Sequence, residues 1–158
     1  SPLRDATRGT AKERNAYHFD SDLLHISKQW NNHALFWFQL PETVKTINKA
    51  VFRVHVDSIK YPAEVQALSM TSPGAYDAAN PNRFAEEPAF ADEAIQTVRV
   101  GKNDEWLEID CTAPVLQALA KDRRFGLAIG LPPETKTWPV MLLHSRQSEE
   151  RPYLEIEK

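Results

Sequence analysis

The side chains of this chain that are best suited to chemistry are aromatic rings next to cationic and amide groups. A sugar-binding surface needs such rings, because the C–H face of a pyranose stacks on them while polar neighbours bind the hydroxyls. Trp37 is the strongest candidate. If the strand with Arg53 and His55 joins the same sheet, the three side chains form an aromatic and cationic patch suited to an acidic sugar. The alternative is that a loop or the N-terminal arm covers Trp37.

Further candidates for glycan contact lie in turns and loops. Each is a ring with hydrogen-bonding neighbours or a hydrogen-bonding group near a ring: Trp30, Tyr76, Asn82, Arg83 and Trp138. Trp30 precedes two asparagines, which also suit an ordinary hairpin turn. Trp138 stands beside a Pro-Pro loop at the entrance of a strand, where packing across the end of the domain is the alternative. For the candidates between residues 76 and 83, the alternative is a solvated loop.

Candidates for catalysis are weaker. Cys111 stands where a strand meets a helix, and a helix N-terminus lowers the pKa of a thiol, so a cysteine hydrolase would use it together with His144 and an acid. The strand pattern places Cys111 on the face of Leu107 and Ile109, which predicts a buried and inert thiol. Paired glutamates fall in loops, whereas the carboxylates of a glycosidase must converge across a cleft. We therefore expect that the protein is not an enzyme.

Metal ligation has only weak support in the sequence. Calcium needs six to eight oxygen ligands, and the densest oxygen clusters, at residues 20–22 and 103–105, give Asp20, Asp22 and Asp104 as calcium candidates. Neither cluster has a loop of defined ligand spacing, so turn chemistry is the alternative. The five histidines show no pair at the helical spacing of a zinc site. We expect no cofactor other than such a structural calcium ion.

Size and charge restrict the class of protein. A chain of 158 residues fits a single domain, which can bury roughly two-thirds of its unfolded surface. The net charge is −3, with acidic and basic residues interspersed, so the concentrated basic surface that nucleic acid requires is missing. No apolar run approaches the ~20 residues that span a bilayer. We expect neither nucleic acid nor a membrane as a partner.

The elements that must position these side chains are mostly strands. Residues 33–40 and 48–56 alternate between apolar and polar with period two, which is typical of strands in a sheet covered on one side. Residues 1–15 are predicted to form an extended arm or an edge strand, and residues 71–92, rich in proline and glycine, a long loop. Further strands are predicted at residues 22–27, 63–70, 94–100, 106–111, 125–131, 138–144 and 152–157.

One short helix interrupts the strands, at about residues 112–121. Asp110 or Thr112 can cap it and Pro114 suits its first turn. Trp106, just before this helix, is expected to be structural. Eight or nine strands with one helix and no βαβ rhythm predict an all-β fold, a two-sheet antiparallel β-sandwich of the jelly-roll type.

Five segments also carry a family likeness, in a characteristic order. They are residues 34–41, 47–56, 106–115 and 125–129, and Ser145-Arg146 with residues 151–156. Over about residues 20–157 the chain resembles the DNRLRE domains, which are related to carbohydrate-binding modules of alginate- and other polysaccharide-degrading enzymes. The resemblance implies a non-catalytic module, excised from a larger secreted or periplasmic protein, that attaches this protein to a polysaccharide, in particular an acidic one. The alternative is a structural or adhesive domain that packs against neighbouring domains and binds no glycan.

Overall fold

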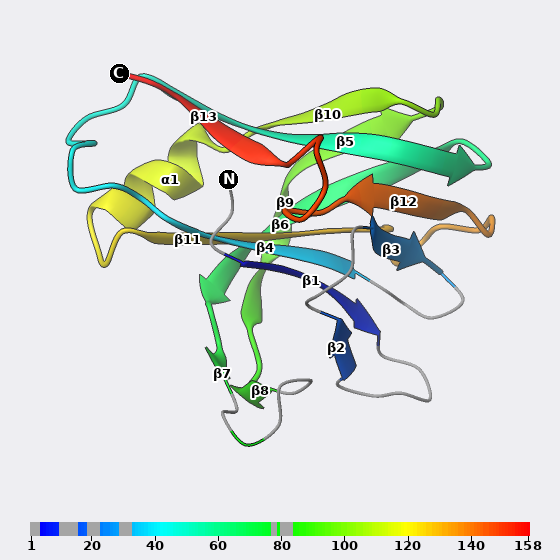
Figure 1. Cartoon of the computed structure of the whole chain (residues 1–158), viewed down its shortest axis with the longest axis horizontal. Coiled ribbons are helices and arrows are strands. Elements are labelled where there is room, and N and C mark those ends of the chain that lie inside the picture. Colours follow the sequence, from blue (N-terminus) through cyan, green and yellow to red (C-terminus); the bar gives the residue numbers. More distant parts are fainter. Residues whose placement is uncertain (1–3, 10–15, 19–22, 29–32, 77–78, 80–83) are drawn as a thin grey trace.

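The computed structural model describes the 158-residue chain except residues 1–3, 10–15, 19–22, 29–32, 77–78 and 80–83 (Figure 1). The described residues form thirteen strands and one helix. The elements are β1 (Arg4–Gly9), β2 (Ala16–His18), β3 (Leu23–Ser27), β4 (His33–Gln39), β5 (Lys49–Lys60), β6 (Ala63–Ser72), β7 (Ala75–Tyr76), β8 (Phe84–Glu86), β9 (Ala89–Val100), β10 (Glu105–Asp110), α1 (Thr112–Leu119), β11 (Arg124–Gly130), β12 (Val140–His144) and β13 (Tyr153–Glu157).

The strands form two stacked sheets, which Figure 1 shows as two layers. The six-stranded sheet has the order β2-β1-β4-β11-β6-β9, and the five-stranded sheet has the order β10-β5-β12-β3, with β13 also paired to β5. The pairings within both sheets are antiparallel. The predicted two-sheet antiparallel β-sandwich is therefore confirmed. In the N-terminal segment, β1 lies between β2 and β4, and β2 forms the edge of its sheet.

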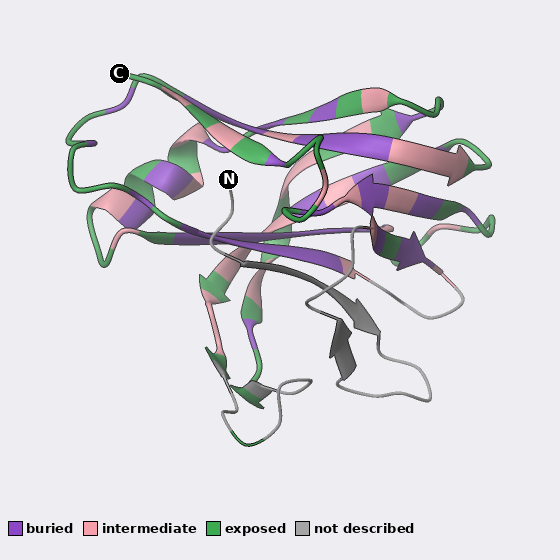
Figure 2. Ribbon diagram, viewed as in Figure 1, coloured by how far each residue is buried: buried purple, intermediate pink, exposed green. Residues whose placement is uncertain are grey.

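The core lies between the two sheets and includes large apolar side chains of β4 and β5. Figure 2 shows that β4 and β11 are buried along most of their length. Phe52 of β5 contacts Phe36 and Phe38 of β4, with ring centroids 4.8 Å and 5.8 Å apart. Burial of each such side chain contributes about 1.5–3 kcal/mol. Because successive side chains of a strand point to opposite faces, the inward position of Phe52 sends Arg53 to the outer face of the five-stranded sheet.

Strand β5 organises the five-stranded sheet because it is paired along both edges. Strand β10 pairs with one edge, and β13 and β12 pair in succession with the other. These registers place Trp106 opposite His55 and Tyr153 opposite Arg53. Polar and aromatic side chains of three strands thus meet on the outer face around the middle of β5.

Helix α1 lies at the end of the sandwich where β5 begins (Figure 1). The N-cap of α1 is Cys111, which makes no side-chain capping hydrogen bond, so the prediction that Asp110 or Thr112 caps the helix was wrong. Asp110, one residue before the N-cap, instead accepts hydrogen bonds at its Oδ1 from the Thr112 backbone N–H, at 3.0 Å, and from Thr112 Oγ1, at 2.6 Å. These hydrogen bonds lower the pKa of Asp110 below its usual 3.8. Val115 and Ala118 are buried against the strands. No helix of the described residues is long and apolar enough to cross a membrane.

The long loop predicted for residues 71–92 is replaced in large part by strands. Strand β6 continues to Ser72, β9 begins at Ala89, and the short strands β7 and β8 pair between them. Figure 1 shows β7 and β8 projecting below the sandwich as a continuation of β6 and β9. The prediction of one continuous loop was wrong. The pairing of β6 with β9 reaches Ser72 and Ala89, and this pairing stabilises strand structure in residues whose own preference for strand is weak.

Candidate glycan-binding site

Trp37 lies on the outer side of the six-stranded sheet and is covered. Only 7% of its surface is exposed, and its Nε1–H donates a hydrogen bond to the Pro73 carbonyl oxygen at 3.0 Å. Arg53 and His55 belong to the five-stranded sheet, so the patch predicted from the three residues does not form. Among the described residues, Trp37 belongs to an apolar cluster with Leu35, Ala128, Met70 and Phe90.

Two exposed rings meet on the outer face of the five-stranded sheet. Trp106 is 41% exposed and Tyr153 is 37% exposed, and their ring centroids lie 5.8 Å apart at 61°. We call this pair the aromatic platform. The prediction that Trp106 is structural was wrong: the alternation that buries Leu107 and Ile109 directs Trp106 to solvent. Offset, tilted ring pairs of this kind offer apolar surface to a ligand.

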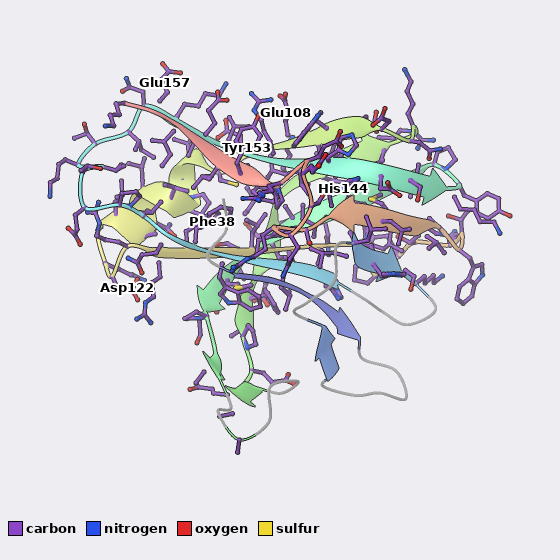
Figure 3. The ribbon with its side chains drawn as sticks, viewed as in Figure 1. Phe38, Glu108, Asp122, His144, Tyr153 and Glu157 are labelled. Atoms are coloured by element: carbon purple, nitrogen blue, oxygen red, sulfur yellow. The ribbon has the colours of Figure 1, made fainter. Side chains whose placement is uncertain are left out.

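Carboxylates surround the aromatic platform. Arg53 forms an ion pair with Glu108, and its Nε lies 3.5 Å from Glu155 Oε2. Figure 3 shows Glu108, Tyr153 and His144 on this layer of the molecule. Three more carboxylates contact the histidines beside the platform: Asp57, Asp104 and Glu150. In these contacts of the described residues, five carboxylates accompany one arginine and two histidines, and this charge balance disfavours an acidic sugar at the platform.

The most exposed rings of the described residues lie at the end of the five-stranded sheet. Trp138 is 59% exposed and Tyr61 is 57% exposed. Strand β5 ends at Lys60, β12 begins at Val140 and β3 ends at Ser27, and the register pairs Val140 with both Lys60 and Ser27. The ends of three strands, and the residues that follow or precede them, thus meet in one place.

Each exposed ring at this end has a lysine against it. Lys28 Nζ lies 4.9 Å from the centroid of the Trp138 ring, and Lys60 Nζ lies 5.5 Å from the centroid of the Tyr61 ring. Both distances are within the range of cation–π contacts. We call these four residues the rim. The exposure of Trp138 argues against the alternative that it packs across the end of the sandwich.

The rim is a cationic part of the surface. The segments that build it, residues 27–28, 60–61 and 132–140, contain three lysines and one glutamate: Lys28, Lys60, Lys136 and Glu134. An exposed ring offers a face to the C–H groups of a sugar, and an ammonium group attracts a carboxylate. The rim therefore combines the two interactions that an acidic sugar needs.

A cleft of about 1070 Å³ lies between α1 and strands of the six-stranded sheet. Its lining combines polar and apolar side chains, among them Gln39, Met70, Glu93, Leu116 and Arg124. The aromatic residues of this lining are Trp37, Phe38 and Phe125, all of them buried. The cleft thus offers no exposed ring among the described residues on which a sugar can stack.

Several predicted site residues fall elsewhere. Trp30, Asn82, Arg83, Asp20 and Asp22 lie outside the described residues, and Tyr76 lies in β7. Asp104 Oδ1 lies 2.8 Å from His55 Nε2. The neighbours of Asp104 serve the turn, since Asn103 Oδ1 accepts from the Ile59 N–H at 2.8 Å. These contacts of Asp104 and of Asn103 do not direct several oxygen atoms to one point, as a calcium site requires.

Cys111 is fully buried, as predicted. Burial raises the pKa of its thiol to about 12, so the thiolate needed by a nucleophile is negligible at neutral pH. The helix N-terminus beside it does not reverse this effect. The cysteine hydrolase considered from the sequence has no activated nucleophile here.

A β-sandwich that presents exposed rings at the end of one sheet fits the class of carbohydrate-binding modules, which bind glycans through aromatic surface. Comparison with protein families gives the particular family: the model of carbohydrate-binding module family 96 matches residues 2–158. The chain belongs to this family. No match was found among curated proteins.

Proposed function

We propose that this module binds an acidic polysaccharide at the rim and thereby attaches a larger, secreted protein to that polysaccharide. The observation that carries the proposal is the contact of a lysine with each of the two most exposed rings among the described residues. The resemblance to modules of enzymes that degrade alginate and other polysaccharides supports an acidic ligand. Such a module contributes binding, and the catalytic chemistry belongs to a partner domain of the parent protein.

In the proposed complex, a sugar ring stacks on Trp138 and its carboxylate pairs with Lys28. The Tyr61 and Lys60 pair does the same for another unit of the chain. Cation–π contacts and exposed ion pairs each contribute only about 0.5–1 kcal/mol. Several weak contacts along one polysaccharide therefore give a Kd in the rough range of micromolar to millimolar.

The aromatic platform supplies a matched control for this proposal. Trp106 is an exposed tryptophan of the same sheet, but the five carboxylates around the platform repel an acidic chain. Replacement of Trp106 by alanine is therefore expected to leave the affinity for an acidic glycan unchanged. Replacement of Trp138 by alanine is expected to weaken it by about 5–30-fold, which corresponds to about 1–2 kcal/mol.

Affinity electrophoresis in gels that contain alginate, polygalacturonate or a neutral glucan tests the proposal. We expect retardation by the acidic glycans, reduced in the Trp138→Ala and Lys28→Ala variants and unchanged in Trp106→Ala. Retardation should fall as salt rises, because a Debye length of about 10 Å at 0.1 M screens exposed charges. Equal retardation by acidic and neutral glycans, or retardation that Trp138→Ala does not alter, contradicts the rim as an acidic-glycan site. Absence of retardation by every glycan favours the structural or adhesive domain instead.

A further inference from the structure

Two histidines and a glutamate meet beside the aromatic platform. His55 comes from β5, His144 from the end of β12, and Glu150 from the connection between β12 and β13. One ligating atom from each of the three lies within 4.8 Å of the other two. His55 Nδ1 is 2.6 Å and His144 Nε2 is 3.9 Å from Glu150 Oε2. Two parts of the chain distant in the sequence, β5 and residues 144–150, thus direct ligand atoms to one point.

The outer nitrogen of each histidine has an acceptor of its own. His55 Nε2 lies 2.8 Å from Asp104 Oδ1, and His144 Nδ1 contacts Ser148 Oγ. When these outer nitrogens carry the protons, the inner nitrogens turn their lone pairs toward Glu150. A histidine that binds a metal through one nitrogen characteristically donates its other N–H to a carboxylate or similar acceptor. The contacts of both rings match that arrangement.

A buried polar atom without a hydrogen bond points independently to a ligand. The His55 side chain is 5% exposed, and its Nδ1 has no partner with hydrogen-bond geometry, although Glu150 Oε2 lies 2.6 Å away. In the tautomer that donates to Asp104, two acceptors therefore face each other at this short distance. Such an arrangement is costly unless a cation lies between them.

We propose that His55, His144 and Glu150 bind a divalent transition metal ion of the zinc class. With metal–ligand distances of about 2.0–2.1 Å, ligands of a tetrahedral site lie about 3.4 Å apart. The separations of 2.6 Å and 3.9 Å from Glu150 Oε2 bracket this value, and the two histidine ligand atoms lie within 4.8 Å of each other, so small side-chain shifts complete the site. Water or Asp57, whose Oδ1 is 3.2 Å from His144 Nε2, takes the fourth position.

The composition of the site selects the kind of ion. Two imidazole nitrogens favour zinc, copper or nickel over calcium and magnesium, which prefer all-oxygen ligands. The five carboxylates around the platform add a negative potential that attracts a cation. The bound ion would tie the connection before β13 to β5. It would also hold His55, whose ring lies 5.1 Å from that of Trp106, and so stiffen the platform.

Metal titration of the tag-free, chelator-treated chain tests the site without any glycan. Calorimetry with Zn²⁺ should show saturable binding of one ion per chain, and Tm should rise with Zn²⁺ concentration. Co²⁺ should give the intense visible absorption of a tetrahedral site. Equal concentrations of Ca²⁺ or Mg²⁺ should show neither saturable binding nor a rise in Tm. This inference does not depend on the proposed glycan site, since the rim contributes no ligand.

Variants separate the site from adventitious binding. Glu150→Gln changes an exposed residue, and its fold can be checked by circular dichroism; it should abolish saturable Zn²⁺ binding, as should His144→Ala. Asp104→Ala, which removes the acceptor behind His55, should weaken binding by roughly 10–100-fold. His25→Ala, which replaces an exposed histidine of β3, should bind Zn²⁺ as the parent does.

Three results would overturn the proposal. The first is the absence of saturable Zn²⁺ binding to the folded chain. The second is binding that persists unchanged in both Glu150→Gln and His144→Ala. The third is a Tm difference between Glu150→Gln and the parent that is the same with and without Zn²⁺. In that case Glu150 and Asp104 would serve only as polar partners of His55.

Discussion

Replacement of Trp37 by alanine should lower stability and leave glycan binding intact. The indole is 7% exposed, packs in an apolar cluster and donates a hydrogen bond to Pro73. Removal of a buried tryptophan side chain costs about 3–5 kcal/mol. For a chain of this size each kcal/mol lowers Tm by about 2–4 °C, so the expected fall is about 6–20 °C.

The matching variant, Trp138→Ala, should behave in the opposite way. Its ring is 59% exposed, so the free energy of unfolding should change by no more than about 0.5 kcal/mol, while the affinity for an acidic glycan falls. Calorimetric melting gives the first quantity. Affinity electrophoresis on alginate, at a temperature well below the Tm of both variants, gives the second.

Trp37→Phe keeps a ring and loses the N–H donor. Loss of the hydrogen bond to the Pro73 carbonyl oxygen should lower the free energy of unfolding by only about 1 kcal/mol.

One result would refute this assignment. If the Trp37→Ala chain is folded and no longer binds alginate, while Trp138→Ala binds as tightly as the parent, the glycan lies on the six-stranded sheet. The cover that Pro73 and its neighbours form over Trp37 would then have to open on binding. A loss of binding that merely follows the unfolded fraction would leave the assignment in place.

Two further predictions concern the junction of β10 and α1. Asp110→Ala removes two hydrogen bonds to Thr112 and should lower the free energy of unfolding by about 1 kcal/mol near neutral pH. Because the folded-state pKa of Asp110 is lowered, this contribution is present above the usual pKa and is lost as pH falls through the lowered value. Urea melts of the variant and parent should therefore differ more at pH 6 than at pH 2.5, and an equal difference at both pH values would contradict this role of the Asp110 carboxylate. The buried Cys111 thiol, with its pKa raised to about 12, should resist iodoacetamide at pH 8 in the native chain and react after unfolding in urea; modification of the folded chain at the rate of a free thiol would disprove its burial.

Local alternation in the sequence was enough to predict the strands at residues 33–40 and 48–56. The inward positions of Phe36, Phe38 and Phe52 agree with the period-two alternation of those strands. The same pattern was insufficient to predict sheet membership. Trp37 and Arg53 share an outward orientation, but β4 and β5 belong to different sheets, because sheet membership depends on pairings between residues far apart in the chain.

Trp106 shows a signal that the sequence did contain. The alternation that correctly predicted a buried Cys111 also puts Leu107 and Ile109 inside, and the same period requires Trp106 to face solvent. Proximity to the helix was the weaker indicator and led to the wrong prediction.

The rim shows a feature that the sequence does not display. Lys28, Lys60 and Trp138 come from three different strand ends, and only the register of β3, β12 and β5 brings them together. Trp138 was a candidate because it stands beside a Pro-Pro loop, whereas no local sequence pattern indicated Tyr61, Lys28 or Lys60. The same holds for His55 and His144, which are 89 positions apart in the sequence and have ring centroids 4.9 Å apart in the fold.

The direction of β5 gives the module a usable orientation. The strand begins beside the C-terminal residue, where Asn48 Nδ2 donates to the Lys158 carbonyl oxygen at 3.1 Å, and it ends at the rim. Its twelve residues span roughly 35 Å. A chain immobilised through Lys158 on a sensor surface would therefore present the rim to the solution and keep it clear of the support. An attachment near Tyr61 would bury the same surface against it.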